Sequence, residues 1–136
     1  MIKEQSPTNT AIAKRDRLLR VTLVLYLLGI ILVSLTPGDY VPNSSQLYMD
    51  KVGHFIAYTG LGFLLGLTVK NRNGRYLAVL CAITLGFLLE WGQFFVPGRE
   101  MSLADGLVNS CGVITGMLLF NWQGRAVENW FARFWR

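Results

Sequence analysis

Four long apolar segments, separated by short polar breaks, restrict the folds that this sequence can adopt. Their approximate bounds are 18–36, 52–69, 76–96 and 103–122. Each is close to the ~20 residues that a helix needs to cross the hydrocarbon core of a bilayer. An isolated strand in lipid would leave backbone groups unpaired, whereas a helix pairs its own. The sequence therefore predicts an all-α integral membrane bundle of four transmembrane helices.

The composition agrees with this class. The chain is 52% hydrophobic and 15% charged, whereas soluble proteins are typically about 25% charged. The net charge of +5 comes from basic residues beside the apolar segments, not from one basic stripe. This arrangement is typical of membrane topology signals, so we expect membrane lipids as partners and no nucleic acid.

The distribution of basic residues predicts the orientation. Of the 13 Lys and Arg residues, only Lys51 and Arg99 lie in the first and third connections. The other 11 lie in the leader, the second connection and the tail, if Arg20 at the start of the first segment is counted with the leader, so the positive-inside rule places both termini in the cytoplasm. The predicted organisation is a polar leader (1–17), a membrane domain (18–122) and a cytoplasmic tail (123–136). The tail alternates aromatics with arginines, which predicts a short amphipathic C-terminal helix on the membrane surface.

The first segment also resembles the core of a signal peptide. Its polar leader is long for one, and no small-x-small cleavage site follows it, so we expect a retained anchor.

Polar residues recur at three- to four-residue spacing at the outer ends of the last three segments. Such spacing places side chains on one helical face, and the predicted orientation brings all three ends to the extracytoplasmic leaflet. The sequence therefore predicts one shared polar site there. Its expected members are Asp50, Lys51, His54, Tyr58, Glu90, Gln93, Arg99, Asp105 and Asn109.

Glu90 is the member least easily explained as a surface or capping residue. It lies inside the third segment, where a charged side chain costs about 2.5–3.5 kcal/mol on insertion scales. It therefore requires a partner, a proton or water. A structural ion pair with Lys51 or Arg99 and a catalytic role both remain open. Asp105, by contrast, also suits a helix N-terminus capped by Ser102.

Small residues predict how the helices pack and turn. Gly62 and Gly66, like Gly112 and Gly116, have the G-x-x-x-G spacing that lets membrane helices approach closely. The pair Pro97-Gly98 is expected to end the third helix and return Arg99 toward the headgroups. Two further residues, Cys81 and Cys111, lie at different predicted depths, so we expect buried free thiols without a disulfide.

In this order, the polar residues between Asp50 and Asn109 resemble the pattern of the VanZ-like family of small bacterial membrane proteins. The pattern has D-K, then H and Y, then E and Q, a P-G-R turn, and finally D and N. The resemblance implies a multi-pass protein of the bacterial cytoplasmic (inner) membrane. The family's association with resistance to teicoplanin, which acts on the extracytoplasmic cell wall, implies a role in the cell envelope.

Three functions remain open from the residues. In the first, the pocket binds a lipid-linked or wall-related anionic ligand through Asp50, Lys51, Tyr58, Gln93, Arg99 and Asn109. In the second, a membrane hydrolase or transferase acts on a lipid-linked substrate, with His54, Glu90 and Asp105 as acid–base residues. In the third, the network is a structural clasp, and function resides in a partner.

The cofactor also remains open. Mg²⁺ or Mn²⁺, held by Asp50, His54, Glu90 and Asp105, would suit this donor set better than a structural zinc.

Overall fold

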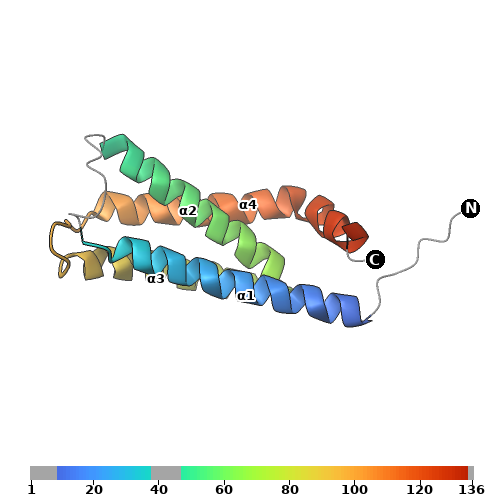
Figure 1. Cartoon of the computed structure of the whole chain (residues 1–136). Helices are drawn as coiled ribbons and strands as arrows, with labels where there is room; N and C mark the ends of the chain where they lie inside the picture. Colours follow the sequence, from blue (N-terminus) through green and yellow to red (C-terminus); the bar gives the residue numbers. More distant parts are fainter. Residues whose placement is uncertain (1–8, 38–46, 135–136) are drawn as a thin grey trace, which may run out of the picture.

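The computed structural model describes residues 9–37 and 47–134, which form four helices and no strand within those ranges. They are α1 (Asn9–Ser34), α2 (Leu47–Thr68), α3 (Arg72–Gln93) and α4 (Leu103–Phe134). Successive helices run in opposite directions along the bundle (Figure 1). One end therefore holds the end of α1, the start of α2, the end of α3 and the start of α4. The all-helical prediction is confirmed.

Three of these helices are long and apolar enough to cross a membrane: α1, α3 and residues Leu103–Gly124 of α4. The predicted span at 52–69 corresponds to α2, which is not among the three. Its first turns carry Asp50, Lys51 and His54, and these side chains lower the mean hydropathy of the helix.

The helix bounds differ from the predicted spans at several points. Helix α1 begins at Asn9, inside the predicted leader, of which residues 1–8 lie outside the described part. The tail was expected to form a short amphipathic helix, and its residues 123–134 are helical as the continuation of α4 to Phe134. No proline interrupts 103–134, so the backbone hydrogen bonds can continue past Trp122. Residues 135–136 of the tail lie outside the described residues.

Glycines hold α2 against α4, with which α2 makes most of its interhelical contacts. A Cβ at Gly62 would collide with the carbonyl of Val113, and a Cβ at Gly116 with the carbonyl of Thr59. At Gly112 an added Cβ would also meet backbone atoms of α2. The predicted close approach through G-x-x-x-G pairs is therefore confirmed for these two helices.

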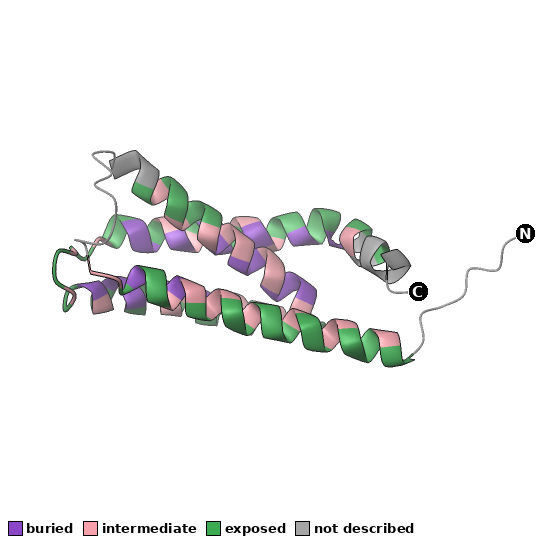
Figure 2. Ribbon diagram, in the orientation of Figure 1, coloured by how far each residue is buried: buried purple, intermediate pink, exposed green. Residues whose placement is uncertain are grey.

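The core lies on the inner faces of the helices, while most of α1 faces outward (Figure 2). Only Ile30 and Ser34 of α1 are buried. Large apolar side chains cover the exterior of all four helices, as expected for a surface in contact with lipid. Both Cys81 and Cys111 are free and exposed, so the expectation of free thiols is confirmed. The expectation that they are buried was wrong, because each lies on an outward face of its helix.

The turn after α3 follows the predicted signal. The helix ends at Gln93 with Phe94 as its C-cap, a few residues before the expected Val96. Gly98 then adopts a φ of 71°, a left-handed conformation that glycine accepts without steric cost. This turn brings Arg99 back to the end of α1, as described below.

Candidate functional site

The predicted polar residues come from three helices and, for Arg99, from the connection between α3 and α4, and they gather at one end of the bundle. Four of them are buried polar side chains: Glu90 is 2% exposed, Gln93 4%, Asp105 7% and Asn109 1%. Buried polar groups at such a depth require partners. The contacts of these side chains therefore decide what the site can do.

Asn109 links the three helices at the centre of the site. Its Nδ2 donates a hydrogen bond to Oε1 of Glu90 at 3.3 Å, and its Oδ1 lies 3.0 Å from Nδ1 of His54. Because the amide oxygen can only accept, the hydrogen on this imidazole lies on Nδ1. The Nδ1 atom is also 3.8 Å from Oε1 of Glu90. One carboxylate, one amide and one imidazole thus form a single network between α2, α3 and α4.

Glu90 does not form the ion pair with Lys51 or Arg99 that was considered from the sequence. Among the described residues, neither Lys51 nor Arg99 forms an ion pair with it, since Lys51 pairs with Asp105 and Arg99 contacts α1. The Oε2 atom of Glu90 is buried and has no hydrogen-bond partner in the described part of the chain. This oxygen is therefore available to a proton, a water molecule or a ligand.

The pair of Lys51 and Asp105 joins the starts of α2 and α4. The backbone N–H of Asp105 also donates to Oγ of Ser102 at 3.2 Å. This is the N-cap that the S-L-A-D segment predicted. Asp105 thus serves both as a first-turn residue and as the partner of a cation from another helix.

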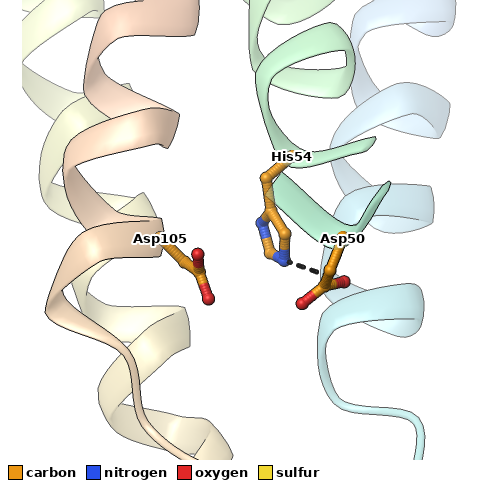
Figure 3. A group of neighbouring side chains, drawn as sticks. All are labelled: Asp50, His54 and Asp105. Carbon is orange, nitrogen blue, oxygen red and sulfur yellow. Dashed lines mark ion pairs between the residues drawn. The ribbon is translucent and has the colours of Figure 1, made fainter. Parts of the chain in front are cut away.

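A second carboxylate lies beside the imidazole. Oδ1 of Asp50 is 3.8 Å from Nε2 of His54, and Figure 3 shows Asp105 on α4 facing these two α2 side chains. One ligand atom from each of the three residues lies within 4.8 Å of the other two. Glu90 is not in this group, so the metal-ligand set differs from the four residues expected.

The donor chemistry of this group suits a divalent cation that accepts two carboxylates and one imidazole, such as Mn²⁺. The ammonium of Lys51 already pairs with Asp105, however, and would compete with such an ion. The three residues therefore suit a metal ion, but the ion would have to compete with Lys51 for the carboxylate of Asp105.

Two of the expected site residues contact α1 instead of the polar network. The Nε2 of Gln93 donates to the carbonyl of Ser34 at 3.2 Å. Arg99 donates from Nε to the carbonyl of Thr36 at 3.1 Å and from Nη2 to that of Val33 at 3.2 Å. The last carbonyls of a helix lack partners within it, so these side chains clasp the end of α1. This role was not predicted, because α1 itself carries no polar stripe.

Tyr58 completes the buried set. It is 1% exposed, and its hydroxyl has no hydrogen-bond partner among the described residues. A Cβ at Gly86 of α3 would lie 3.3 Å from the Tyr58 ring, so this glycine makes room for the ring.

A cavity of about 560 Å³ lies between α1 and α2. Its apolar lining includes Leu25, Gly29 and Ile30 of α1 with Gly53 and Ala57 of α2, and its polar lining includes Asp50, His54, Tyr58 and Arg99. The hydroxyl of Tyr26 bridges the two helices by donating to the carbonyl of Ala57 at 2.9 Å. The contribution of α1 was not predicted, because its lining residues are ordinary membrane-helix side chains. The cavity therefore joins an apolar space to the polar site.

Apolar helices of membrane length around a buried polar network define a small helical membrane protein. A family model described as VanZ/LLP1 matches residues 5–124. The chain therefore belongs to the VanZ/LLP1 family, and the resemblance inferred from its ordered polar residues is confirmed. No curated protein and no solved structure is significantly similar to the chain.

Proposed function

We propose that this protein binds a lipid-linked, anionic component of the bacterial cell envelope. The observation that carries the proposal is the cavity between α1 and α2, which combines an apolar lining with Asp50, His54 and Arg99. A lipid-linked molecule has the same two parts, a hydrocarbon chain and a polar head. Sites of a few hundred Å³ with a few convergent polar groups are typical of ligand binding.

Each polar residue has a place in this proposal. Arg99 uses Nε and Nη2 to hold α1, which leaves Nη1 to donate to a phosphate or carboxylate of the ligand. Asp50 would accept hydrogen bonds from hydroxyl or amide groups of the head. Asn109, Gln93 and Tyr58 support the site from behind, and Lys51 holds Asp105 in place.

The proposed location follows from the charge distribution. All four helices would span the bacterial inner membrane, with α2 shielded by its neighbours and both termini in the cytoplasm. The membrane domain would be residues 18–122, flanked by the leader 1–17 and the tail 123–136. The cavity would then open at the extracytoplasmic leaflet, where wall precursors are used. Binding of such a precursor would also connect this protein to teicoplanin resistance.

Filling the cavity tests the proposal. Gly29 and Gly53 line it, and a Cβ at either position would meet nothing within 4 Å. Gly29→Leu and Gly53→Leu should therefore fold normally and occupy the space of the ligand's chain. Val21→Phe, on the exposed face of α1, is the matched control.

The readout is native mass spectrometry of lipids that co-purify from bacterial membranes. We expect a lipid-linked envelope molecule on the wild type and on Val21→Phe, and its loss from both glycine variants. Retention of the same molecule by Gly29→Leu and Gly53→Leu would exclude this cavity as the binding site. Teicoplanin susceptibility of strains that carry these variants tests the link to resistance in the same way.

A second candidate function, a membrane hydrolase or transferase, is favoured by the proximity of Asp50, His54 and Asp105. A metal held there would supply an activated water, and Glu90 would act as the base. Glu90→Gln separates chemistry from binding, because it removes the base and keeps the shape. Loss of the envelope phenotype with the ligand still bound supports the enzyme, whereas full function in Glu90→Gln counts against it.

A further inference from the structure

A second cavity, of about 400 Å³, lies at the opposite end of the bundle from the polar site. It is formed by the connection between α2 and α3, the first turns of α3, and α4. Its lining includes three cations, Lys70, Arg72 and Arg75, together with the apolar side chains of Val79 and Met117. None of the described residues that line it carries a carboxylate. The cavity therefore offers positive charge beside an apolar surface.

Neutral partners hold both arginines in place. Nε of Arg72 donates to the hydroxyl of Tyr76 at 3.0 Å. Nε of Arg75 donates to the carbonyl of Val69 at 2.7 Å, and its guanidinium lies 4.5 Å from the ring centroid of Phe120. These contacts orient the guanidinium groups without neutralising their charge.

Among the side chains that the structure describes, the arginines have no anionic partner, and the ion pairs of this end involve Arg15, Lys70 and Asp16. Asp16 compensates for Lys70, so Arg72 and Arg75 keep their full charge. Their terminal N–H groups have no acceptor in the described part of the chain. Two oriented guanidinium groups without a carboxylate suit the oxygens of a phosphate, which accept paired N–H donors.

We propose that this basic cavity binds the phosphate of an anionic phospholipid headgroup in the leaflet at that end of the bundle. Val79 and Met117 would contact the first carbons of the acyl chains. Basic pockets between membrane helices on the cytoplasmic side bind lipid headgroups in this manner. The site is distinct from the α1–α2 cavity, so either proposal can fail without the other. A purely topological role of the three cations is the alternative that the experiment must separate.

The test uses the full chain in nanodiscs that contain equal amounts of phosphatidylglycerol and phosphatidylcholine. Native mass spectrometry compares the lipids retained by the wild type, Arg72→Gln and Arg75→Gln. Arg72 is exposed, so its replacement should leave the fold intact. The matched control is Arg17→Gln, an exposed arginine of α1 outside the cavity with the same change of charge.

We expect the wild type and Arg17→Gln to retain phosphatidylglycerol preferentially. Each cavity variant should lower that preference about fivefold, which corresponds to the ~1 kcal/mol that one basic residue contributes near an anionic lipid surface. An equal loss of phosphatidylglycerol preference in Arg17→Gln, or no such preference in the wild type, would overturn the proposal in favour of a topological role. Displacement of the lipid by soluble glycerophosphate at equal concentration would overturn it in favour of a free-phosphate site. A thermal unfolding curve for each variant shows whether a loss of lipid preference reflects unfolding. Arg72→Lys keeps the positive charge and should therefore retain part of the preference for phosphatidylglycerol.

Discussion

Asn109 donates a hydrogen bond to Glu90 at 3.3 Å between two helices, and both side chains are almost completely buried. The same amide faces the imidazole of His54 at 3.0 Å. One neutral side chain thus lies between a carboxylate and an imidazole, whose Oε1 and Nδ1 atoms are 3.8 Å apart. The stability and the chemistry of the site therefore both depend on Asn109.

Asn109→Leu should destabilise the protein strongly. Leucine is similar in size, but it leaves Glu90 and His54 buried without their shared partner, which costs about 1–3 kcal/mol for each unsatisfied group. The measurement is the free energy of unfolding in mixed micelles titrated with SDS. Ser110→Ala is the control, because the Ser110 hydroxyl donates only to Gly106 of its own helix. Equal stability of the two variants would show that the network contributes nothing to folding.

Gly116→Ala should separate α2 from α4. The added Cβ would collide with the carbonyl of Thr59 and lie 2.7 Å from the backbone nitrogen of Phe63, and neither backbone atom can rotate away. We expect a loss of about 1–3 kcal/mol in the free energy of unfolding, as for other overpacked sites.

Gly53→Ala is the matched control for that experiment. Nothing lies within 4 Å of its added Cβ, so the substitution should leave stability unchanged or raise it by about 0.5–1 kcal/mol through helix propensity. A Gly116→Ala protein as stable as Gly53→Ala would contradict the close packing of α2 and α4.

Removal of Lys51 should strengthen the binding of a divalent cation. Lys51 pairs with Asp105, which is one of the three grouped ligand residues, and its positive charge opposes a metal. Lys51→Gln should increase the affinity for Mn²⁺ at least about fivefold, since two unit charges 4 Å apart repel by ~1 kcal/mol even in water. Electron paramagnetic resonance of free Mn²⁺ measures this affinity. His54→Gln should weaken it, and identical titrations of all three proteins would exclude a metal at this group.

The connection between α2 and α3 and the connection between α3 and α4 should lie on opposite sides of the membrane. In a variant that lacks Cys81 and Cys111, a single cysteine is introduced at Glu100 or at Asn73, both exposed. A membrane-impermeant maleimide added to intact spheroplasts should label Glu100→Cys, and should label Asn73→Cys only after the membrane is permeabilised. The opposite result would reverse the orientation predicted from the basic residues.

Some residues of the site could be assigned from sequence because their signals are local. The spacing of Asp50, His54 and Tyr58 within one segment places them on one face of α2, and Ser102 and Asp105 mark the start of α4. The Gly112 and Gly116 spacing likewise identifies a contact face before the partner helix is known.

The partners of these residues could not be assigned in this way. An ion pair of Glu90 with Lys51 or Arg99 was one of two interpretations left open, but the structure pairs Glu90 with Asn109 and pairs Lys51 with Asp105. Periodicity defines a face of a helix, but not how far one helix is rotated or shifted along its neighbour. A shift of one turn changes which polar side chains meet.

The sequence by itself determined the helical class, the polar character of one bundle end and membership of the VanZ/LLP1 family, because hydropathy, helical spacing and residue order are properties of the chain. Tertiary structure alone decided that Gln93 and Arg99 contact the end of α1 and that a cavity lies between α1 and α2. It also decided that Cys81 and Cys111 face outward. The physical reason is that each of these features depends on the relative rotation and depth of two helices. Contacts between helices, such as that of Gly116 with Thr59, establish this rotation and depth only when the bundle packs.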